Sequence, residues 1–185
     1  CTVRKFYIFM NLLHTDRLDL RPCQLEDLDS VHELWCDAEI RRFLFDDREI
    51  SREEAQAFIE ASIASFSDHG YGIWLFFDNH SHQIAGFTGL LQFTEELPSL
   101  IFGVRPQLWG LGYATEATLA VLDYAFVNLG IKYIVADVDE PNDRSIRVLD
   151  KIGMSQTKRA IVNERPLLYY EIYAPNRKNI NNGRD

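Results

Sequence analysis

Two glycines, Gly110 and Gly112, interrupt the chain between an apolar run at residues 100–104 and a helical stretch that begins near Tyr113. A glycine cap would follow a helix, and a hairpin glycine would lie between two strands, so neither explains this placement. Bare backbone N–H groups at the positive end of a helix dipole bind anions, so one interpretation is a phosphate site. The other interpretation is a plain strand-to-helix turn that needs positive φ. The glycines alone favour neither.

The composition restricts the class of protein. The chain has 185 residues, of which 46% are hydrophobic and 25% are charged, and this predicts one ordinary globular domain. Its formal charge of −9 argues against nucleic acid as the main partner, because phosphate backbones need a basic face. The same charge fits an anionic surface that attracts cationic substrates, although many proteins are acidic for solubility alone. An anion site in this chain would therefore depend on backbone dipoles rather than on clustered lysines.

The spacing of cysteine and histidine predicts neither a disulfide framework nor a metal site. Cys1, Cys23 and Cys36 are odd in number and lack CxxC spacing. We therefore expect free thiols in a reducing, cytoplasmic compartment. His80 and His82 stand alone in a polar turn, where such a pair is more often solvated than metal-bound, so no metal is predicted.

The two ends of the chain are expected to lie outside the folded domain. Residues 1–12 combine basic and apolar residues, but the apolar patch is too short to cross a membrane and no small-residue cleavage site follows. We interpret residues 1–12 as an N-terminal extension or a cloning remnant, with Met10 as a natural start and the residues before it as a remnant or an alternative start. A lipidated N-terminal cysteine is the alternative. The folded domain is predicted over residues 13–175, with a polar tail at residues 176–185.

The elements that position the two glycines follow from the hydrophobic periodicity. Strands are predicted at residues 17–23, 71–77, 83–93, 100–104 and 132–138, followed by a hairpin that turns at Asn163 and Glu164. The three strands within residues 71–104 are expected to pair as an antiparallel meander. The glycine loop then follows the fourth strand of a mixed α/β sheet. A doubly wound dinucleotide fold would need alternating βαβ units and fits poorly.

Four helices are predicted between these strands. The first carries Leu25, Leu28, Val31 and Leu34 at helical spacing. The second begins at Ser51, which forms a capping box with Glu54. The third spans residues 113–129 and ends at Gly130, and the fourth lies within residues 142–153. A short apolar patch at residues 40–45 receives no assignment.

The glycine loop does not match two standard phosphate motifs. GxxxxGK[ST] is absent, and GxGxxG fails because Thr115 stands at the third glycine. Residues 107–112, "QLWGLG", instead resemble the Q/R-x-x-G-x-G/A signature of the GNAT acyltransferases, which holds the pyrophosphate of acetyl-coenzyme A. The longer string "RPQLWGLGYATEAT" resembles the branch that includes the ribosomal-protein N-terminal acetyltransferases.

Three further segments resemble the same branch in the same order. They are "HTDRLDLRP" at residues 14–22, "DAEIRRFLF" at residues 37–45 and "PNDRSIRVLDKIGM" at residues 141–154. The resemblance spans residues 13–173, and four ordered matches favour the anion site over the plain turn. It implies an α/β (α+β) fold with a mixed, mostly antiparallel central sheet flanked by helices. In this GNAT-like fold the fourth and fifth strands splay apart.

The resemblance also implies how acetyl-coenzyme A would bind. Backbone groups of Phe102 and Val104 would pair with the pantetheine arm as a β-strand does, and the Val104 amide would be the oxyanion donor. For Asn142 a helix N-cap is an alternative role, and for Lys151 a solvated side chain. The implied cofactor-binding positions are Phe102, Val104, Gln107, Gly110, Leu111, Gly112, Tyr113, Ala114, Asn142, Ser145 and Lys151.

The chain departs from the wider family at both acid–base positions. Leu149 stands where a general-acid tyrosine is common, and Ser99 stands where this branch often has a glutamate. We therefore assign Ser145 as the candidate proton donor. Glu96, or its neighbour Glu95, is the candidate base in the loop before the strand, although surface carboxylates are usually only solvated.

These residues predict an acetyl-CoA-dependent N-acetyltransferase that acts on a protein N-terminal α-amine or a small amine. We expect a monomer or homodimer in the cytoplasm, without nucleic-acid or membrane partners. The acidic residues 137–143, "DVDEPND", suit a polycation, although a solvated loop explains them equally well, so a polyamine or antibiotic acetyltransferase is the alternative. With Asp139 and the two loop glutamates near the acceptor mouth, cationic acceptors are expected. The altered acid–base positions leave a non-catalytic acyl-CoA binding module as a third possibility.

Overall fold

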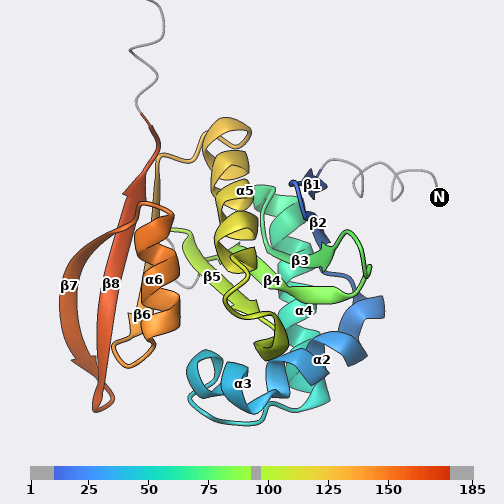
Figure 1. Cartoon of the computed structure of the whole chain (residues 1–185), viewed down its shortest axis with the longest axis horizontal. Helices are drawn as coiled ribbons and strands as arrows, with labels where there is room; N and C mark the ends of the chain where they lie inside the picture. The colour runs from blue at the N-terminus through green and yellow to red at the C-terminus, as the bar shows by residue number, and fades with distance from the viewer. Residues whose placement is uncertain (1–10, 93–96, 176–185) are drawn as a thin grey trace, which may run out of the picture.

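The computed structural model describes residues 11–92 and 97–175. Among these residues eight strands form one sheet in the order β1-β2-β3-β4-β5-β6-β8-β7 (Figure 1). Neighbouring strands are antiparallel except β5 and β6, which are parallel. The strands are β1 (Leu13–His14), β2 (Leu18–Pro22), β3 (Ile73–Asp78), β4 (Ile84–Leu91), β5 (Ser99–Val104), β6 (Tyr133–Asp139), β7 (Ser155–Val162) and β8 (Arg165–Tyr173). The expected mixed, mostly antiparallel sheet is confirmed.

Helices flank the sheet on both faces (Figure 1). The described helices are α2 (Leu28–Cys36), α3 (Ala38–Leu44), α4 (Arg52–His69), α5 (Tyr113–Val127) and α6 (Asp143–Lys151), with short 3-10 turns η1 (Leu25–Asp27) and η2 (Pro106–Leu108). On strand β3, Trp74 and Phe76 belong to the core under α5 and α6. Ile73 and Leu75 of the same strand belong to the core under α2 and α4. Burial on both faces explains why this strand is a continuous apolar run.

Several local predictions are confirmed. The Ser51 hydroxyl accepts a hydrogen bond from the Glu54 N–H at 3.1 Å, and the Glu54 carboxylate accepts one from the Ser51 N–H at 2.8 Å. This capping box begins α4. The final hairpin turns at Asn163 and Glu164, whose φ angles are 48° and 65°. Strands β3, β4 and β5 form the expected antiparallel meander.

Two regions differ from the sequence predictions. Leu25 lies in η1 and is 44% exposed instead of facing the core. The Asp27 carboxylate accepts hydrogen bonds from Arg21 and from the Gln24 N–H, and α2 begins only after it. The unassigned patch at residues 40–45 is largely helix α3, which begins where the Asp37 carboxylate accepts a hydrogen bond from the Glu39 N–H at 2.9 Å.

Strands β5 and β6 diverge, as expected for the fourth and fifth predicted strands; the additional strand β1 shifts their numbers. Their parallel pairing is limited to one register pair, Ser99 with Val135. The Val135 N–H donates to the Pro98 carbonyl at 3.2 Å. Beyond this point β5 pairs only with β4, and β6 pairs with β8. The facing edges of β5 and β6 are therefore separated by a gap in the sheet.

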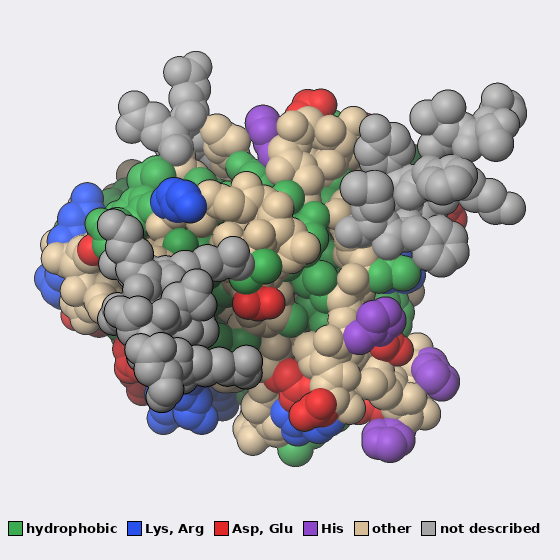
Figure 2. Space-filling model, turned by 90° about the horizontal axis from the view of Figure 1, so that it is seen from above, with side chains coloured by type: hydrophobic (Ala, Val, Ile, Leu, Met, Phe, Trp, Pro, Cys, Tyr) green, Lys and Arg blue, Asp and Glu red, His purple; other side chains and the backbone are tan. Residues whose placement is uncertain are grey.

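The described part of the face shown in Figure 2 is mixed in charge. On the face shown in Figure 2, the Lys and Arg side chains lie in separate groups among acidic and polar surface. The described part of this face therefore lacks the broad basic stripe that is typical of nucleic-acid-binding surfaces. None of the helices within residues 11–92 and 97–175 is both long enough and apolar enough to cross a bilayer.

Candidate active site

A cavity of about 730 Å³ lies where β5 and β6 diverge. Its lining comes from both faces of the sheet. Leu100 and Phe102 of β5 pack with the core under α5 and α6, whereas Ile101 and the β4 residue Phe87 pack with the core under α2 and α4. Because the sheet is open between β5 and β6, the cavity connects its two faces.

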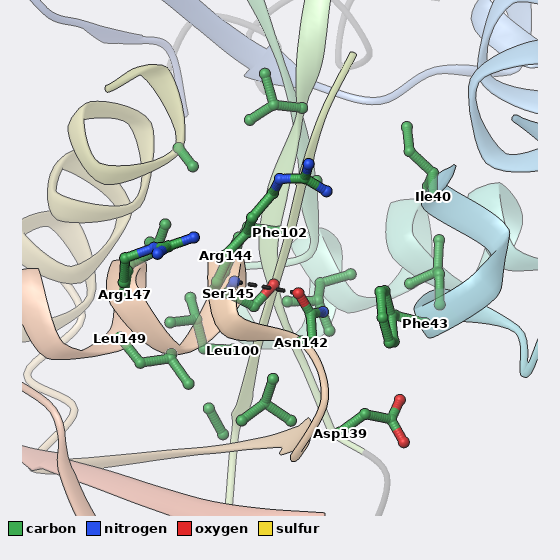
Figure 3. A pocket seen from close by; sticks show the side chains of 18 of the residues that line it. Ile40, Phe43, Leu100, Phe102, Asp139, Asn142, Arg144, Ser145, Arg147 and Leu149 are labelled. Carbon is green, nitrogen blue, oxygen red and sulfur yellow. Dashed lines mark hydrogen bonds between the residues drawn. The ribbon is translucent and has the colours of Figure 1, made fainter. Parts of the chain in front are cut away.

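Figure 3 shows the side chains around this cavity. Asn142 and Ser145 extend from α6 on one side, and Ile40 and Phe43 extend from α3 on the other. Asp139 of β6 lies at the edge between them. The cavity is therefore polar on the α6 side and largely apolar on the α3 side, with a carboxylate between the two.

The glycine loop forms one end of the cavity. Gly110 and Gly112 have φ angles of 81° and 83°, so the turn does need glycine. Gly112 is also the N-cap residue of α5, and no side chain caps this helix. The first N–H groups of α5, including those of Tyr113 and Ala114, therefore lie at the positive end of an uncapped helix. A Cβ atom at Gly110 would meet no atom within 4 Å, so the space before the loop is open to a ligand.

Arg17 anchors this loop from the start of β2. Its Nη1 donates to the Leu111 carbonyl at 2.8 Å, and its Nε donates to the Glu116 carboxylate at 2.7 Å. The Thr15 hydroxyl donates to the same carboxylate at 2.6 Å. Burial raises the pKa of Glu116, but the hydrogen bonds from Thr15 and Arg17 outweigh it and leave that pKa below its ordinary value. Because Arg17 and Glu116 are 99 residues apart, no local sequence signal predicted this contact.

The Tyr113 hydroxyl is engaged in a hydrogen bond and is therefore not the proton donor for catalysis. It donates to the Asp78 carboxylate at the end of β3, with 2.5 Å between the oxygens. This hydrogen bond, together with those from the Ser81 and His80 N–H groups, lowers the pKa of Asp78 to about 2. Tyr113 therefore offers the cavity its backbone N–H rather than its phenol.

The free edge of β5 presents hydrogen-bonding groups to the gap. The Arg105 N–H donates to the Ala85 carbonyl at 2.9 Å, so alternate residues counted back from Arg105 direct their N–H groups toward β4. The N–H groups of Phe102 and Val104 consequently point toward the gap. The Val104 carbonyl accepts a hydrogen bond from the Trp109 indole at 2.8 Å, so at this residue the N–H is the group left for a ligand.

Helix α6 brings Asn142, Ser145 and Leu149 to one face. The Asn142 Oδ1 accepts a hydrogen bond from the Ser145 N–H at 3.2 Å (Figure 3), so the N-cap role of Asn142 is confirmed. That role occupies the oxygen only, and the side-chain NH₂ donates to no other described residue. Ser145 is half-buried in the cavity wall. Leu149, at 1% exposed, continues the same face into the core.

Two carboxylates on β6 line the cavity. Asp139 is buried and lies 3.1 Å from Arg165, which also contacts Asp46. The side chain of Asp137 is solvent-exposed, but it lies in the concave wall, where the surrounding protein desolvates it and raises its pKa. Burial raises the pKa of Asp139, and the nearby negative charge of Asp137 raises it further. The sequence reasoning singled out Asp139 and gave Asp137 no individual role.

The structure brings together most of the positions implied by the sequence. Those that line the cavity are Phe102, Val104, Gly110, Gly112, Tyr113, Ala114, Asn142, Ser145 and Lys151. Gln107 lies on η2 with an exposed side chain, and Leu111 is 50% exposed; neither lines the cavity. Ser99 and Leu149, the two altered acid–base positions, both do. Glu95 and Glu96 lie outside the described residues.

Arg144 is a cavity residue that the sequence reasoning missed. Its guanidinium lies 3.9 Å from the centre of the Trp109 ring and 4.0 Å from the Glu39 carboxylate. It thereby joins α6 to the segment before the glycine loop and to α3. An arginine on an exposed helix position carries no sequence signal for such contacts.

Comparisons with known proteins agree with this geometry. The family model described as an acetyltransferase (GNAT) domain matches residues 17–155. The uncharacterized N-acetyltransferase p20 of Bacillus licheniformis is 26% identical over 153 residues, which cover 80% of this chain and 84% of that protein. Spermidine N(1)-acetyltransferase of Escherichia coli K12 is 29% identical over 139 residues, which cover 74% and 72%. The solved structure of RimL, a ribosomal L7/L12 alpha-N-protein acetyltransferase in complex with coenzyme A, has a TM-score of 0.76 at 15% identity, and the match covers 88% of this chain and 97% of that one.

Proposed function

The chain belongs to the GNAT acetyltransferase family, and from this premise we propose that the cavity between β5 and β6 transfers the acetyl group of acetyl-CoA to a primary amine. The enzyme class, an acetyl-CoA-dependent N-acetyltransferase, follows from the family and its relatives. The observation that carries the assignment of the site is that one cavity joins the uncapped N-terminus of α5 to the unpaired edge of β5.

The residues present fit the donor. The N–H groups of the loop from Gly110 to Ala114 would hold the pyrophosphate, and the open space before Gly110 supports this assignment. The Phe102 and Val104 backbone would pair with the pantetheine amides as an added strand. The free NH₂ of Asn142 would donate to the same arm. Lys151, which also lines the cavity, would approach the nucleotide phosphates.

The chemical step needs an oxyanion donor and a proton for the leaving sulfur. Bound acetyl-CoA supplies an activated thioester. The Val104 N–H would stabilise the oxygen that becomes negative, and one such donor is worth about 2.7–4 kcal/mol. Ser145 would give a proton to the sulfur directly or through water, since Leu149 has none to give. A thiol pKa of about 8.5 makes a thiolate a tolerable leaving group, so this assistance is modest.

The acceptor is a protein N-terminal α-amine or a small amine. The fold shared with a ribosomal L7/L12 alpha-N-protein acetyltransferase supports the first. A polyamine is the second candidate, supported by a relative named spermidine N(1)-acetyltransferase. The carboxylates Glu39, Asp46, Asp137 and Asp139 around the cavity also favour a cationic acceptor.

The described thiols support a reducing, cytoplasmic compartment. Cys23 and Cys36 are both free. Burial raises the pKa of the Cys23 thiol to about 12, which makes this cysteine unreactive. Neither residue lines the cavity, so neither of these two thiols would carry the acetyl group.

Turnover on a panel of amines tests the proposal. Release of the coenzyme A thiol is followed with spermidine, with a peptide that has a free N-terminus, and with the same peptide acetylated at its N-terminus as the matched control. We expect thiol release that requires the free amine, with the acetyl group found on nitrogen by mass spectrometry. Binding of acetyl-CoA without turnover on any amine would contradict the proposal and support a non-catalytic acyl-CoA binding module.

A further inference from the structure

We propose that Asp137 of β6 is the general base that takes a proton from the attacking amine, in place of the carboxylate that β5 lacks at Ser99. The proposal rests on the function proposed above and identifies a further catalytic residue in the same cavity. Serine has no basic group at neutral pH, and the cavity still has to receive amines that arrive protonated. A carboxylate on the neighbouring strand can do this work.

The register of the sheet places Asp137 on the same face as Ser99. Ser99 pairs with Val135 in the parallel bridge between β5 and β6, so these two side chains project from the same face. Side chains alternate along a strand, and Asp137 therefore projects from that face as well. Ala136 and Val138 belong to the opposite core under α5 and α6. Asp137 thus faces the α3 side, one strand across from the altered position.

Asp137 differs from the other carboxylates of the cavity in having no cationic partner among the described residues. Arg165 engages both Asp139 and Asp46. Glu39 pairs with an arginine of α6 at 4.0 Å. Asp137 forms no hydrogen bond or ion pair with residues 11–92 or 97–175, and its side chain is accessible within the cavity. It is therefore the cavity carboxylate that is available to an incoming ammonium group.

The surroundings of Asp137 make it a stronger base than a freely solvated aspartate. Desolvation raises its pKa above the ordinary range for aspartate, and a stronger base accepts a proton more readily. The reaction must then slow as the pH falls through this raised pKa, because the protonated carboxyl cannot accept a proton. The charged or titratable groups that neighbour it in the sheet or share the cavity include Asp139 on β6, Tyr169 and Glu171 on β8, Lys158 on β7, whose ammonium group lies over the Tyr169 ring, Arg165 at the start of β8, Arg144 on α6, and Glu39 and Asp46 from the α3 region.

The protons and electron pairs balance. The amine enters as R–NH₃⁺, and one of its protons moves to the Asp137 carboxylate. The freed lone pair forms the N–C bond to the acetyl carbon, the C–S bond breaks, and its electron pair stays on sulfur. A second N–H proton reaches the sulfur through Ser145 or water. Asp137 then releases its proton to solvent. The net reaction converts R–NH₃⁺ and the thioester into the amide, the coenzyme A thiol and H⁺.

The test compares Asp137→Asn with Asp143→Asn, a matched control. Asp143 lies in the same acidic segment and loses the same charge, but it is exposed and does not line the cavity. With a lysine-like primary amine, whose pKa is about 10.4, kcat/KM of Asp137→Asn at neutral pH should fall by about 100-fold or more. Asp143→Asn should stay within about fivefold of wild type. Calorimetry with coenzyme A should give the same affinity for both variants, which shows that the fold and the donor site are intact.

The pH dependence separates a base from a structural role. For each amine that the wild type accepts, the loss in Asp137→Asn should shrink as the pH approaches the pKa of that amine, because a neutral amine needs no base. It should be smaller for a peptide α-amine, whose pKa is about 7.7–8. Asp137→Glu should restore part of the rate. If the wild type acetylates an amine and Asp137→Asn has the same kcat/KM as Asp143→Asn, the proposal for Asp137 is overturned and the proposed function stands. A loss of kcat/KM in Asp137→Asn that does not change with pH would have the same consequence. A wild type that acetylates no amine would overturn the proposed function itself.

Discussion

Replacement of Gly110 by alanine separates the backbone role of the glycine loop from its role in binding. Gly110 has a φ of 81°, and a Cβ atom there would meet nothing within 4 Å. Gly130, which follows α5, has a φ of 68° and equally open surroundings, but it does not line the cavity. Gly110→Ala and Gly130→Ala therefore impose the same kind of backbone strain, and only the first adds a methyl group where the phosphate would approach.

The two variants should lose similar stability and differ in affinity. A left-handed backbone costs an L-residue about 1–2 kcal/mol. For a chain of this size, that lowers the Tm by about 2–8 °C in each variant. A hydrogen bond from a loop N–H to a charged phosphate contributes about 1.5–3 kcal/mol. Its loss in Gly110→Ala should weaken coenzyme A binding by about 10- to 150-fold, and Gly130→Ala should bind as the wild type does.

Calorimetric titration with coenzyme A, together with thermal unfolding of each variant, provides the measurement. Alanine is preferred to valine at this position, because a β-branched side chain adds further strain at positive φ and confuses misfolding with loss of binding. Equal coenzyme affinity in a folded Gly110→Ala and in Gly130→Ala would refute the assignment of the pyrophosphate to this loop.

Three further changes test other parts of the site. Ser145→Ala should lower turnover by about 10- to 100-fold in single-turnover kinetics, with coenzyme affinity almost unchanged; an unaltered chemical step would leave water as the proton donor. Asn142→Ala removes the cap of α6 and should lower the free energy of unfolding by about 0.5–2 kcal/mol in denaturant titrations, whereas Asn142→Ser should retain most of it. The folded-state pKa of Glu116 lies below its ordinary value of 4.5, so its contribution to stability is present above pH 4.5 and is lost as the pH falls further. The Tm difference between wild type and Glu116→Gln should therefore be largest at neutral pH and shrink at about pH 3, and a constant difference would contradict this linkage.

Local patterns made much of the fold predictable. The Ser51–Glu54 capping box and the turn at Asn163 and Glu164 are encoded within a few residues, so the sequence shows them directly. Leu25 was misplaced because its helical spacing continues through the cap formed at Asp27, and spacing alone does not reveal where a helix begins. The anchoring of the glycine loop by Arg17 depends on residues that only the folded sheet brings together.

In the candidate site, too, some residues could be predicted from local patterns and others could not. The glycine loop and the start of α6 contain short motifs, so Gly110, Asn142 and Ser145 could be named from the sequence. Asp137 could not, because its access depends on the divergence of β5 and β6 and on the pairing of its neighbours with Arg165. Leu149 was identified as a departure from the family. The structure adds that this leucine is buried, at 1% exposed, in the wall of the cavity.

Amide resonances offer the most direct test of the claim that the gap between β5 and β6 is the donor site. In ¹⁵N-labelled protein titrated with acetyl-CoA, the largest shifts should fall on the amides of Phe102 and Val104 at the strand edge and of Gly110, Gly112 and Ala114 in the loop. The amides of helix α4, none of whose residues lines the cavity, should remain unchanged. The claim would be contradicted if acetyl-CoA caused saturable shifts that cluster elsewhere and leave the amides of the β5 edge and the glycine loop unaffected.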